Sequence, residues 1–163
     1  MIIQNEVHYT FNRDLAIYAW SHDTRIYANF WNPAVFKDPE FLQCMFCFVP
    51  NKPEFSSMIG LGDDWNMDTI TYEEIAKKEA IFGKDTKFII TLGGDGCMWY
   101  EQGKLVKSRS VTSLNPKILS DYQVVDTVGA GDSFMAGFCR IHVKYDWETM
   151  NPDAYNENIN NCM

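Results

Sequence analysis

The segment Val124–Phe134, VVDTVGAGDSF, places two glycines that flank an alanine before an aspartate, where a strand pattern gives way to a helix pattern. Small residues at a helix N-terminus let the backbone approach a phosphate, and the first-turn amides have no partners inside the helix. Phosphoryl transfer needs such donors for the charge on the transferred group and a base for the acceptor hydroxyl. The candidate base is Asp132. The candidate anion-hole amides are those of Gly129, Ala130 and Gly131.

The same segment also fits a simpler structural interpretation. A tight strand-to-helix turn would need the glycines, and Asp132 would then be a first-turn acid that stabilises the helix dipole. The segment is not a Walker A loop, because no Gly-Lys-Ser/Thr follows, and it lacks the spacing of the dinucleotide-binding fingerprint. The residues alone leave both interpretations open.

Composition limits the classes of partner. The chain has 163 residues, of which 46% are hydrophobic and 22% charged, as expected for one globular domain. Its formal net charge of −8 argues against nucleic acid or an anionic membrane as partner. A nucleotide would have to be held by local amides and a cation. With no basic leader and no apolar stretch near the roughly 20 residues that span a bilayer, we expect a cytoplasmic protein with no membrane contact.

The cysteines include one C-x-x-C pair, Cys44 and Cys47, among five in all. Such a pair could be a redox couple or half of a zinc site. No second pair or paired histidine follows, and the surrounding segment is hydrophobic. We therefore interpret both residues as small apolar side chains in a buried strand.

Apolar periodicity and turn residues predict alternating strands and helices. We expect strands over 1–7, 25–31, 41–49, 87–92 and near 124–125, and a hairpin over 97–107. Helices are expected over 12–20, 53–60, 71–80 and 130–143, the first with Phe11, Leu15 and Tyr18 at helical spacing. This order predicts an α/β fold, a Rossmann-like open and mostly parallel sheet with helices on both faces. Ligands bind such sheets at the carboxyl ends of the strands, where the polar and glycine-rich segments 51–54, 91–96 and 126–132 fall.

The segment Asp126–Phe134 closely resembles the second signature of the ribokinase-like (pfkB) carbohydrate kinases. Other matches follow the family's order. Pro50–Glu54 resembles its Asn-x-x-Glu element, and Thr91–Gly96 resembles its nucleotide-binding strand end. Gln4–Glu6 and Asn32–Ala34 are similar to segments of ribokinases. The chain is thereby identified as similar to sugar kinases, most of all to ribokinase.

The resemblance implies a role for each matched residue. Asp132 would take the proton from the sugar hydroxyl as it attacks the γ-phosphate of ATP, over an anion hole of Gly129, Ala130 and Gly131. Asn51 and Glu54 would organise Mg²⁺ and the phosphates through water. The nucleotide would be contacted by Thr91, Gly93 and Gly96. Asp126 lies where ribokinases bind a monovalent cation such as K⁺, and Glu6 where they contact the sugar.

Each role has a structural alternative. Asn51 could cap the helix that begins near Pro53, and Glu54 could be a solvated first-turn acid. The glycines of 93–96 could serve only a hairpin. Asp126 and Glu6 could be ordinary acids of a turn and of a strand end.

The resemblance extends over residues 1–143 but corresponds only to the later half of the family's domain, followed by an Asn-rich, frayed tail over 144–163. We therefore expect an incomplete sugar kinase, with strand edges and apolar faces left uncovered and little turnover of its own. The implied partners are a small-molecule sugar and ATP. The alternatives are a non-catalytic nucleotide- or sugar-binding remnant of the same fold, and a fructokinase or nucleoside kinase.

Overall fold

The computed structural model describes residues 1–29, 32, 35–62, 64–77, 87–101, 104–108 and 126–144. The chain divides into two compact units. The first comprises residues 1–90 and 98–106, and the second comprises 91–97 and 107–163.

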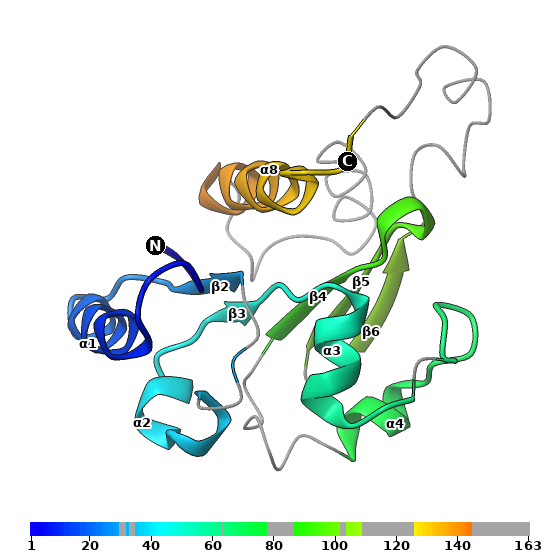
Figure 1. Cartoon of the computed structure of the whole chain (residues 1–163), viewed down its shortest axis with the longest axis horizontal. Helices are drawn as coiled ribbons and strands as arrows, with labels where there is room; N and C mark the ends of the chain where they lie inside the picture. The colour runs from blue at the N-terminus through cyan, green and yellow to red at the C-terminus, as the bar shows by residue number, and fades with distance from the viewer. Residues whose placement is uncertain are drawn as a thin grey trace. The chain divides into compact units, whose positions relative to one another are not determined.

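The described strands form a six-stranded sheet in which spatial order follows chain order (Figure 1). The strands are β1 (Ile2–Gln4), β2 (Tyr27–Asn29), β3 (Cys47–Phe48), β4 (Lys87–Thr91), β5 (Cys97–Glu101) and β6 (Lys104–Ser108). The first four pair in parallel. The connections to β5 and β6 are far shorter than the dozen residues that a parallel crossover needs, so these strands run antiparallel as a meander. The predicted open, mostly parallel α/β sheet with a hairpin is confirmed.

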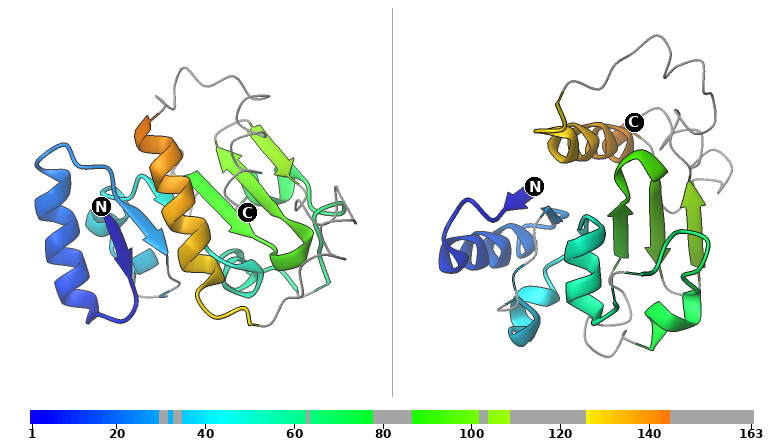
Figure 2. Two further views of the ribbon diagram at one scale, coloured as in Figure 1. Left: turned by 90° about the horizontal axis from the view of Figure 1, so that it is seen from above. Right: turned by 45° about the vertical axis from the view of Figure 1, so that its right-hand side comes forward.

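The helices of the first unit supply the crossovers. They are α1 (Tyr9–Trp20), α2 (Pro39–Leu42) after a 3-10 turn η1 (Val35–Lys37), α3 (Lys52–Ile59) and α4 (Tyr72–Ala76). Right-handed crossovers between strands in sequential order place successive helices on the same face. Figures 1 and 2 show α1, α2 and α3 on one side of the strands. The second unit contains the turn η2 (Gly93–Asp95) and the helix α8 (Ala130–Lys144).

Strand register aligns an aromatic core beneath α3. Phe48 pairs with Phe88, and their rings stack with centroids 5.8 Å apart. The ring of Phe55 on α3 meets Phe88 edge-on at 5.7 Å, and Trp65 lies against Phe55 at 5.9 Å. Such edge-to-face contacts add to the free energy gained by removing the rings from water.

Local sequence signals set several helix ends correctly. Both α3 and α4 begin with a full capping box, at Asn51–Glu54 and Thr71–Glu74, and α3 ends at Gly60 in the left-handed conformation (φ +67°). The predicted start of α8 at Ala130 is also confirmed. Beyond Lys77, the rest of the predicted helix 71–80 lies outside the described residues, as do the strand end at 124–125 and the tail from 145 on.

The predicted strand over 41–49 is wrong in its first half. Phe41 lies on α2, and only Cys47–Phe48 is extended and paired. Asp38 caps α2 by accepting from the Phe41 amide, and Pro39 occupies the first turn. These two start signals precede the apolar run and outweigh its strand-like composition.

The C-x-x-C pair is structural among the described residues. Cys44 and Cys47 are both buried and reduced, although Cys44 follows α2 rather than lying in the strand. No cluster of three or more potential metal ligands occurs in the part of the chain that the structure describes. Within that same part, every helix is too short or too polar to cross a bilayer.

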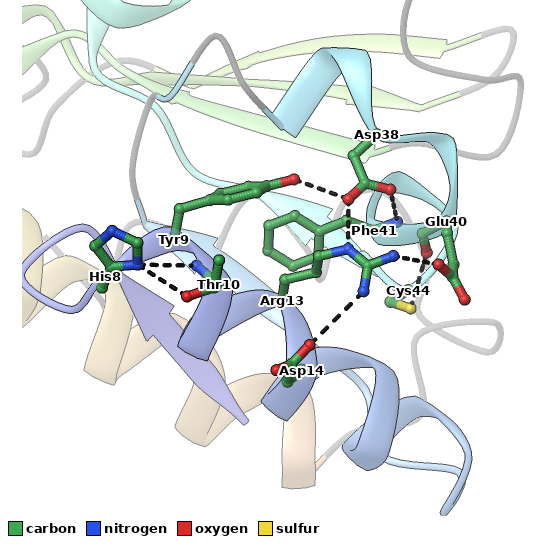
Figure 3. Close-up of polar contacts among 9 residues, drawn as sticks. All are labelled: His8, Tyr9, Thr10, Arg13, Asp14, Asp38, Glu40, Phe41 and Cys44. Carbon is green, nitrogen blue, oxygen red and sulfur yellow. Dashed lines mark hydrogen bonds and ion pairs between the residues drawn. The ribbon is translucent and has the colours of Figure 1, made fainter.

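One polar network joins α1 to the start of α2 (Figure 3). The Asp38 carboxylate accepts hydrogen bonds from Arg13 Nε at 2.6 Å and from the Tyr9 hydroxyl at 2.9 Å, and Arg13 also pairs with Glu40. Burial alone would raise the pKa of Asp38, but the hydrogen bonds from Arg13, the Phe41 amide and Tyr9 outweigh it and hold that pKa below its usual range. Burial, reinforced by the bond to Asp38, raises the pKa of Tyr9 to about 12.

The depressed pKa of Asp38 makes the stability of this network dependent on pH. Its contribution is present above about pH 4, the pKa of an unfolded aspartate, and is lost as the pH falls through the lower folded value. Asp38→Asn keeps the helix cap but removes the charge, so we expect it to lower the free energy of unfolding by about 1 kcal/mol at pH 7. In urea titrations, the difference from wild type should shrink toward zero as the solution is acidified.

The matched control is Asp14→Asn, because the exposed Asp14 lies 3.7 Å from the same guanidinium. It should change the free energy of unfolding little at any pH. Equal losses of unfolding free energy in the two variants would show that Asp38 acts only through its net charge and not through its hydrogen bonds.

Candidate phosphoryl-transfer site

The turn before α8 has the backbone shape that its glycines predict. Gly129 has φ +76°, a conformation that a side chain strains, and its carbonyl accepts from the Ser133 amide to begin the helix. Asp132 lies on the first turn of α8 and is exposed. The structure therefore places an acid on the first turn of a helix that begins directly after Gly129, whose backbone conformation favours glycine.

Not all of the candidate anion-hole amides are equivalent. The Ala130 amide donates to the Thr127 carbonyl at 3.1 Å, so in this conformation it is committed to the turn. Within the described residues, the amides of Gly129 and Gly131 donate to no backbone carbonyl of the turn. A Cβ added at Gly131 would meet nothing within 4 Å. The structure thus favours Gly129 and Gly131 over Ala130 as donors to an anion.

The candidate nucleotide segment after β4 is a tight glycine turn. Thr91 ends β4, and Gly93 (φ +58°) and Gly96 (φ +109°) both adopt backbone conformations that favour glycine. The Leu92 amide donates to the Gly96 carbonyl at 2.8 Å and closes the turn into β5. The hairpin role of these glycines is confirmed, and Gly93 remains exposed.

Asn51 and Glu54 bind each other's backbone at the start of α3. The Asn51 amide donates to Glu54 Oε2 at 2.8 Å, and the Glu54 amide donates to Asn51 Oδ1 at 2.9 Å. The capping role is therefore real. It engages one oxygen of each side chain and fixes the direction of the Glu54 carboxylate, whose Oε1 lies outside the capping box.

Asp126 and Glu6 are both exposed acids in turns. Asp126 is exposed, and its Oδ1 accepts from the Val128 amide at 2.9 Å, which makes it the acid of a local turn. Glu6 is exposed in the turn that follows β1.

Sheet topology explains which of these residues share an edge. The carboxyl ends of the parallel strands β1 and β3 lie at one edge, and these ends lead to Glu6 and to Asn51. Glu6, Asn51 and Glu54 belong to the first unit. Thr91, Gly93, Gly96 and the segment 126–132 belong to the second unit.

Lys52, which lies between Asn51 and Glu54, was not predicted from the sequence as a residue of the site. Its ammonium group lies 5.1 Å from the centre of the Trp65 ring, and the Trp65 indole donates to Ser56 Oγ at 2.7 Å. The ring thus supports a cation at the N-terminus of α3. No short-range spacing signals this contact, because Trp65 reaches α3 from a loop beyond the helix.

Comparison with solved structures finds the same α/β fold in two ribokinases. Arabidopsis thaliana ribokinase complexed with ribose and ATP superposes with a TM-score of 0.69 at 23% identity, covering 97% of this chain and 45% of that one. Ribokinase from Cryptococcus neoformans in complex with ADP gives a TM-score of 0.67 at 23% identity, covering 99% and 51%.

The family follows from the sequence itself. The pfkB family carbohydrate kinase model matches residues 9–148, so the chain belongs to that family. A 1-phosphofructokinase of Vibrio cholerae is 30% identical over 95 residues, which is 58% of this chain and 26% of the relative. The chain therefore spans about a quarter of that relative and about half of the ribokinases.

The conformation of the turn before α8 predicts that alanine substitution of its two glycines affects the free energy of unfolding differently. Gly129→Ala places a side chain at φ +76° and should lower the free energy of unfolding by about 1 kcal/mol. Gly131→Ala has open space for its Cβ on a helical backbone and should be neutral or slightly stabilising. Urea unfolding followed by circular dichroism measures both. Equal losses for the two variants would contradict the left-handed turn.

Proposed function

We propose that this chain carries the phosphoryl-transfer chemistry of an ATP-dependent sugar kinase. The observation that carries the proposal is Asp132 on the first turn of α8, a helix that begins directly after the left-handed Gly129. Membership of the pfkB family supports the same chemistry. The acceptor would be a sugar hydroxyl, and the donor would be ATP.

In the proposed reaction, the Asp132 carboxylate accepts the proton of the sugar hydroxyl. The hydroxyl oxygen then forms a bond to the γ-phosphorus, and the bond from that phosphorus to the β–γ bridging oxygen breaks in line to release ADP. The amides of Gly129 and Gly131 stabilise the negative charge on the transferred group. Their position at the start of α8 adds the partial positive charge of the helix N-terminus.

The remaining candidate residues would hold the nucleotide and the cations. Thr91, Gly93 and Gly96 would contact the nucleotide, and the small turn leaves the exposed Gly93 backbone open to approach. Mg²⁺ is commonly held by one or two carboxylates plus phosphates and water, and the Glu54 carboxylate with its outlying Oε1 fits that pattern. When bound, the ion would neutralise phosphate charge. We assign a monovalent cation such as K⁺ to Asp126, and the sugar to Glu6 and Asp132.

The similar proteins support a sugar or a related compound as the acceptor. One solved relative is a ribokinase complexed with ribose and ATP, and the curated relative is a 1-phosphofructokinase. We propose ribose as the first acceptor to test and fructose as the second, with transfer to a primary hydroxyl. A cytoplasmic location would give such an enzyme its ATP.

A nucleotide-binding module without turnover is the second candidate function. Two observations favour it. The Ala130 amide is committed to Thr127, and the chain covers only 45% of the Arabidopsis ribokinase. Such a module would bind Mg-ATP and leave the sugar unphosphorylated.

Substitution of Asp132 separates the two candidates. For a kinase, Asp132→Asn should reduce ATP-dependent phosphorylation of ribose or fructose by about 10²–10⁴-fold, because the acceptor loses its base. The rise in Tm caused by Mg-ATP should persist, since the anion-binding amides are unchanged. Asp14→Asn, at an exposed acid of α1 outside the candidate site segments, is the control and should keep its turnover. A wild-type chain stabilised by Mg-ATP but without turnover would support the binding module, and a fully active Asp132→Asn would overturn the proposed base.

Glu54→Gln tests the metal assignment while preserving the fold. Glutamine at this position can still complete a capping box, so the Tm without ligand should change little. The lost charge should weaken stabilisation by Mg-ATP several-fold relative to wild type. Glu74→Gln makes the same change in the matching box of α4 and should leave nucleotide binding unaltered. Equal responses from both variants would argue against Glu54 as the Mg²⁺ residue.

A further inference from the structure

The candidate site segments carry almost no positive charge. Segments 4–6, 51–54, 91–96 and 126–132 contain one basic residue, Lys52, and five acids: Glu6, Glu54, Asp95, Asp126 and Asp132. The chain as a whole has a formal net charge of −8. A nucleotide brings further negative charge on its phosphates, and a bound Mg²⁺ would neutralise only part of it. Lys52 is therefore the one side chain of these segments whose charge favours a phosphate.

Trp65 is fixed against the side of α3 that carries Lys52. Its indole N–H donates to Ser56 Oγ at 2.7 Å, and its ring meets Phe55 edge-on with centroids 5.9 Å apart. Trp65 is only 7% exposed. Ser56 lies one turn after Lys52 and donates its hydroxyl to the Lys52 carbonyl at 2.9 Å, so the two residues share a side of the helix. The indole is thus a rigid platform beside the first turn of α3.

The Lys52 ammonium group rests on this platform. It lies 5.1 Å from the ring centre, and the residue is half-buried. The ion pairs found among the described residues do not include Lys52. Glu54 is two positions away on another side of the helix, and its Oε2 accepts from the Asn51 amide. An aromatic face attracts an ammonium group without neutralising it, so Lys52 keeps its charge for a ligand.

We propose that Lys52 binds a phosphate of the nucleotide, and that Trp65 holds its ammonium group beside the start of α3 before the phosphate arrives. This inference rests on the proposed assignment of Asn51 and Glu54 to Mg²⁺ and the phosphates. Side chains on a helix lean toward its N-terminus, which directs the flexible lysine stem toward that position. On binding, the ammonium group exchanges the ring for phosphate oxygens, with which it forms charge-assisted hydrogen bonds. Trp65 is a positioning residue, because it acts through Lys52.

Lys52→Met tests the proposal, because methionine keeps an unbranched apolar stem against the ring and removes the charge. Isothermal titration with Mg-ATP should give a Kd about tenfold higher than for wild type, since a charge-assisted bond to phosphate is lost. Lys52→Arg should recover most of the affinity, because a guanidinium also binds phosphate. The control is Lys77→Met, the same change at an exposed lysine at the end of α4, and it should leave the Kd unchanged.

Fluorescence follows the movement of the ammonium group. In wild type, addition of Mg-ATP should change the tryptophan emission, because a positive charge leaves the face of the Trp65 indole. The change should be far smaller in Lys52→Met and in Trp65→Phe. Trp65→Phe should raise the Kd for Mg-ATP less than Lys52→Met does, because the lysine remains. An emission change that persists in full in Lys52→Met would contradict the exchange of partners.

Measuring binding rather than turnover separates this inference from the kinase chemistry. In an Asp132→Asn background, which removes the proposed base, Lys52→Met should raise the Kd by the same factor. A wild-type chain that binds Mg-ATP without turnover would remove the proposed chemistry and leave this inference standing. If the contact only fastens the loop that carries Trp65, Lys52→Met will lower the Tm and leave the Kd unaltered, and that result would overturn the proposal. So would equal Kd values for Lys52→Met and Lys77→Met, or a wild-type chain that does not bind Mg-ATP.

Discussion

Parallel pairing of β1 to β4 is the constraint on which the arrangement of this protein depends. A parallel neighbour cannot be reached by a tight turn, so β1, β2 and β3 are each followed by a crossover that carries a helix. Register then stacks Phe48 on Phe88, and α3 closes over that pair through Phe55. The same constraint places the carboxyl ends of β1 to β4 at one edge of the sheet. The polar turns gather there because the apolar runs end there.

The start of α3 shows how one local motif can serve structure and chemistry together. The capping box of Asn51 and Glu54 is the same device as that of Thr71 and Glu74 at α4. What distinguishes α3 is its place directly after a parallel strand, and Lys52 resting over Trp65. A capping motif therefore identifies a helix start in the sequence, but only its place in the sheet suggests a ligand.

Short-range signals account for the elements that the sequence predicted well. The capping boxes, Gly60 and the glycine turn before α8 each act within a few residues, and the helix ends that they set lie close to the predicted bounds. The prediction of a strand over 41–49 was wrong because the apolar composition was given more weight than the helix cap at Asp38. At α1, the spacing of Phe11, Leu15 and Tyr18 marks a helix correctly, yet the side that faces the core carries Asn12, Ala16 and Ala19. Which side is buried depends on neighbours that local periodicity does not contain.

The candidate site also has some features that residue type predicts and others that it does not. The sequence predicted the acid at 132 and the backbone freedom at 129, because both follow from residue type. It did not predict that the Ala130 amide would close the turn onto Thr127, since that depends on the backbone path through the turn.

Burial of the sulfur atoms has a practical consequence for covalent labelling. Cys44 and Cys47 are enclosed and donate to carbonyl oxygens, and burial raises the pKa of the Cys44 thiol, which keeps it protonated and a poor nucleophile. Cys97 is buried as well, whereas Cys139 on α8 is partly accessible. Among the described cysteines, an alkylating dye should therefore react first at Cys139. That position lies about two turns from Asp132 on the same helix, so the dye would report on the helix that bears the acid.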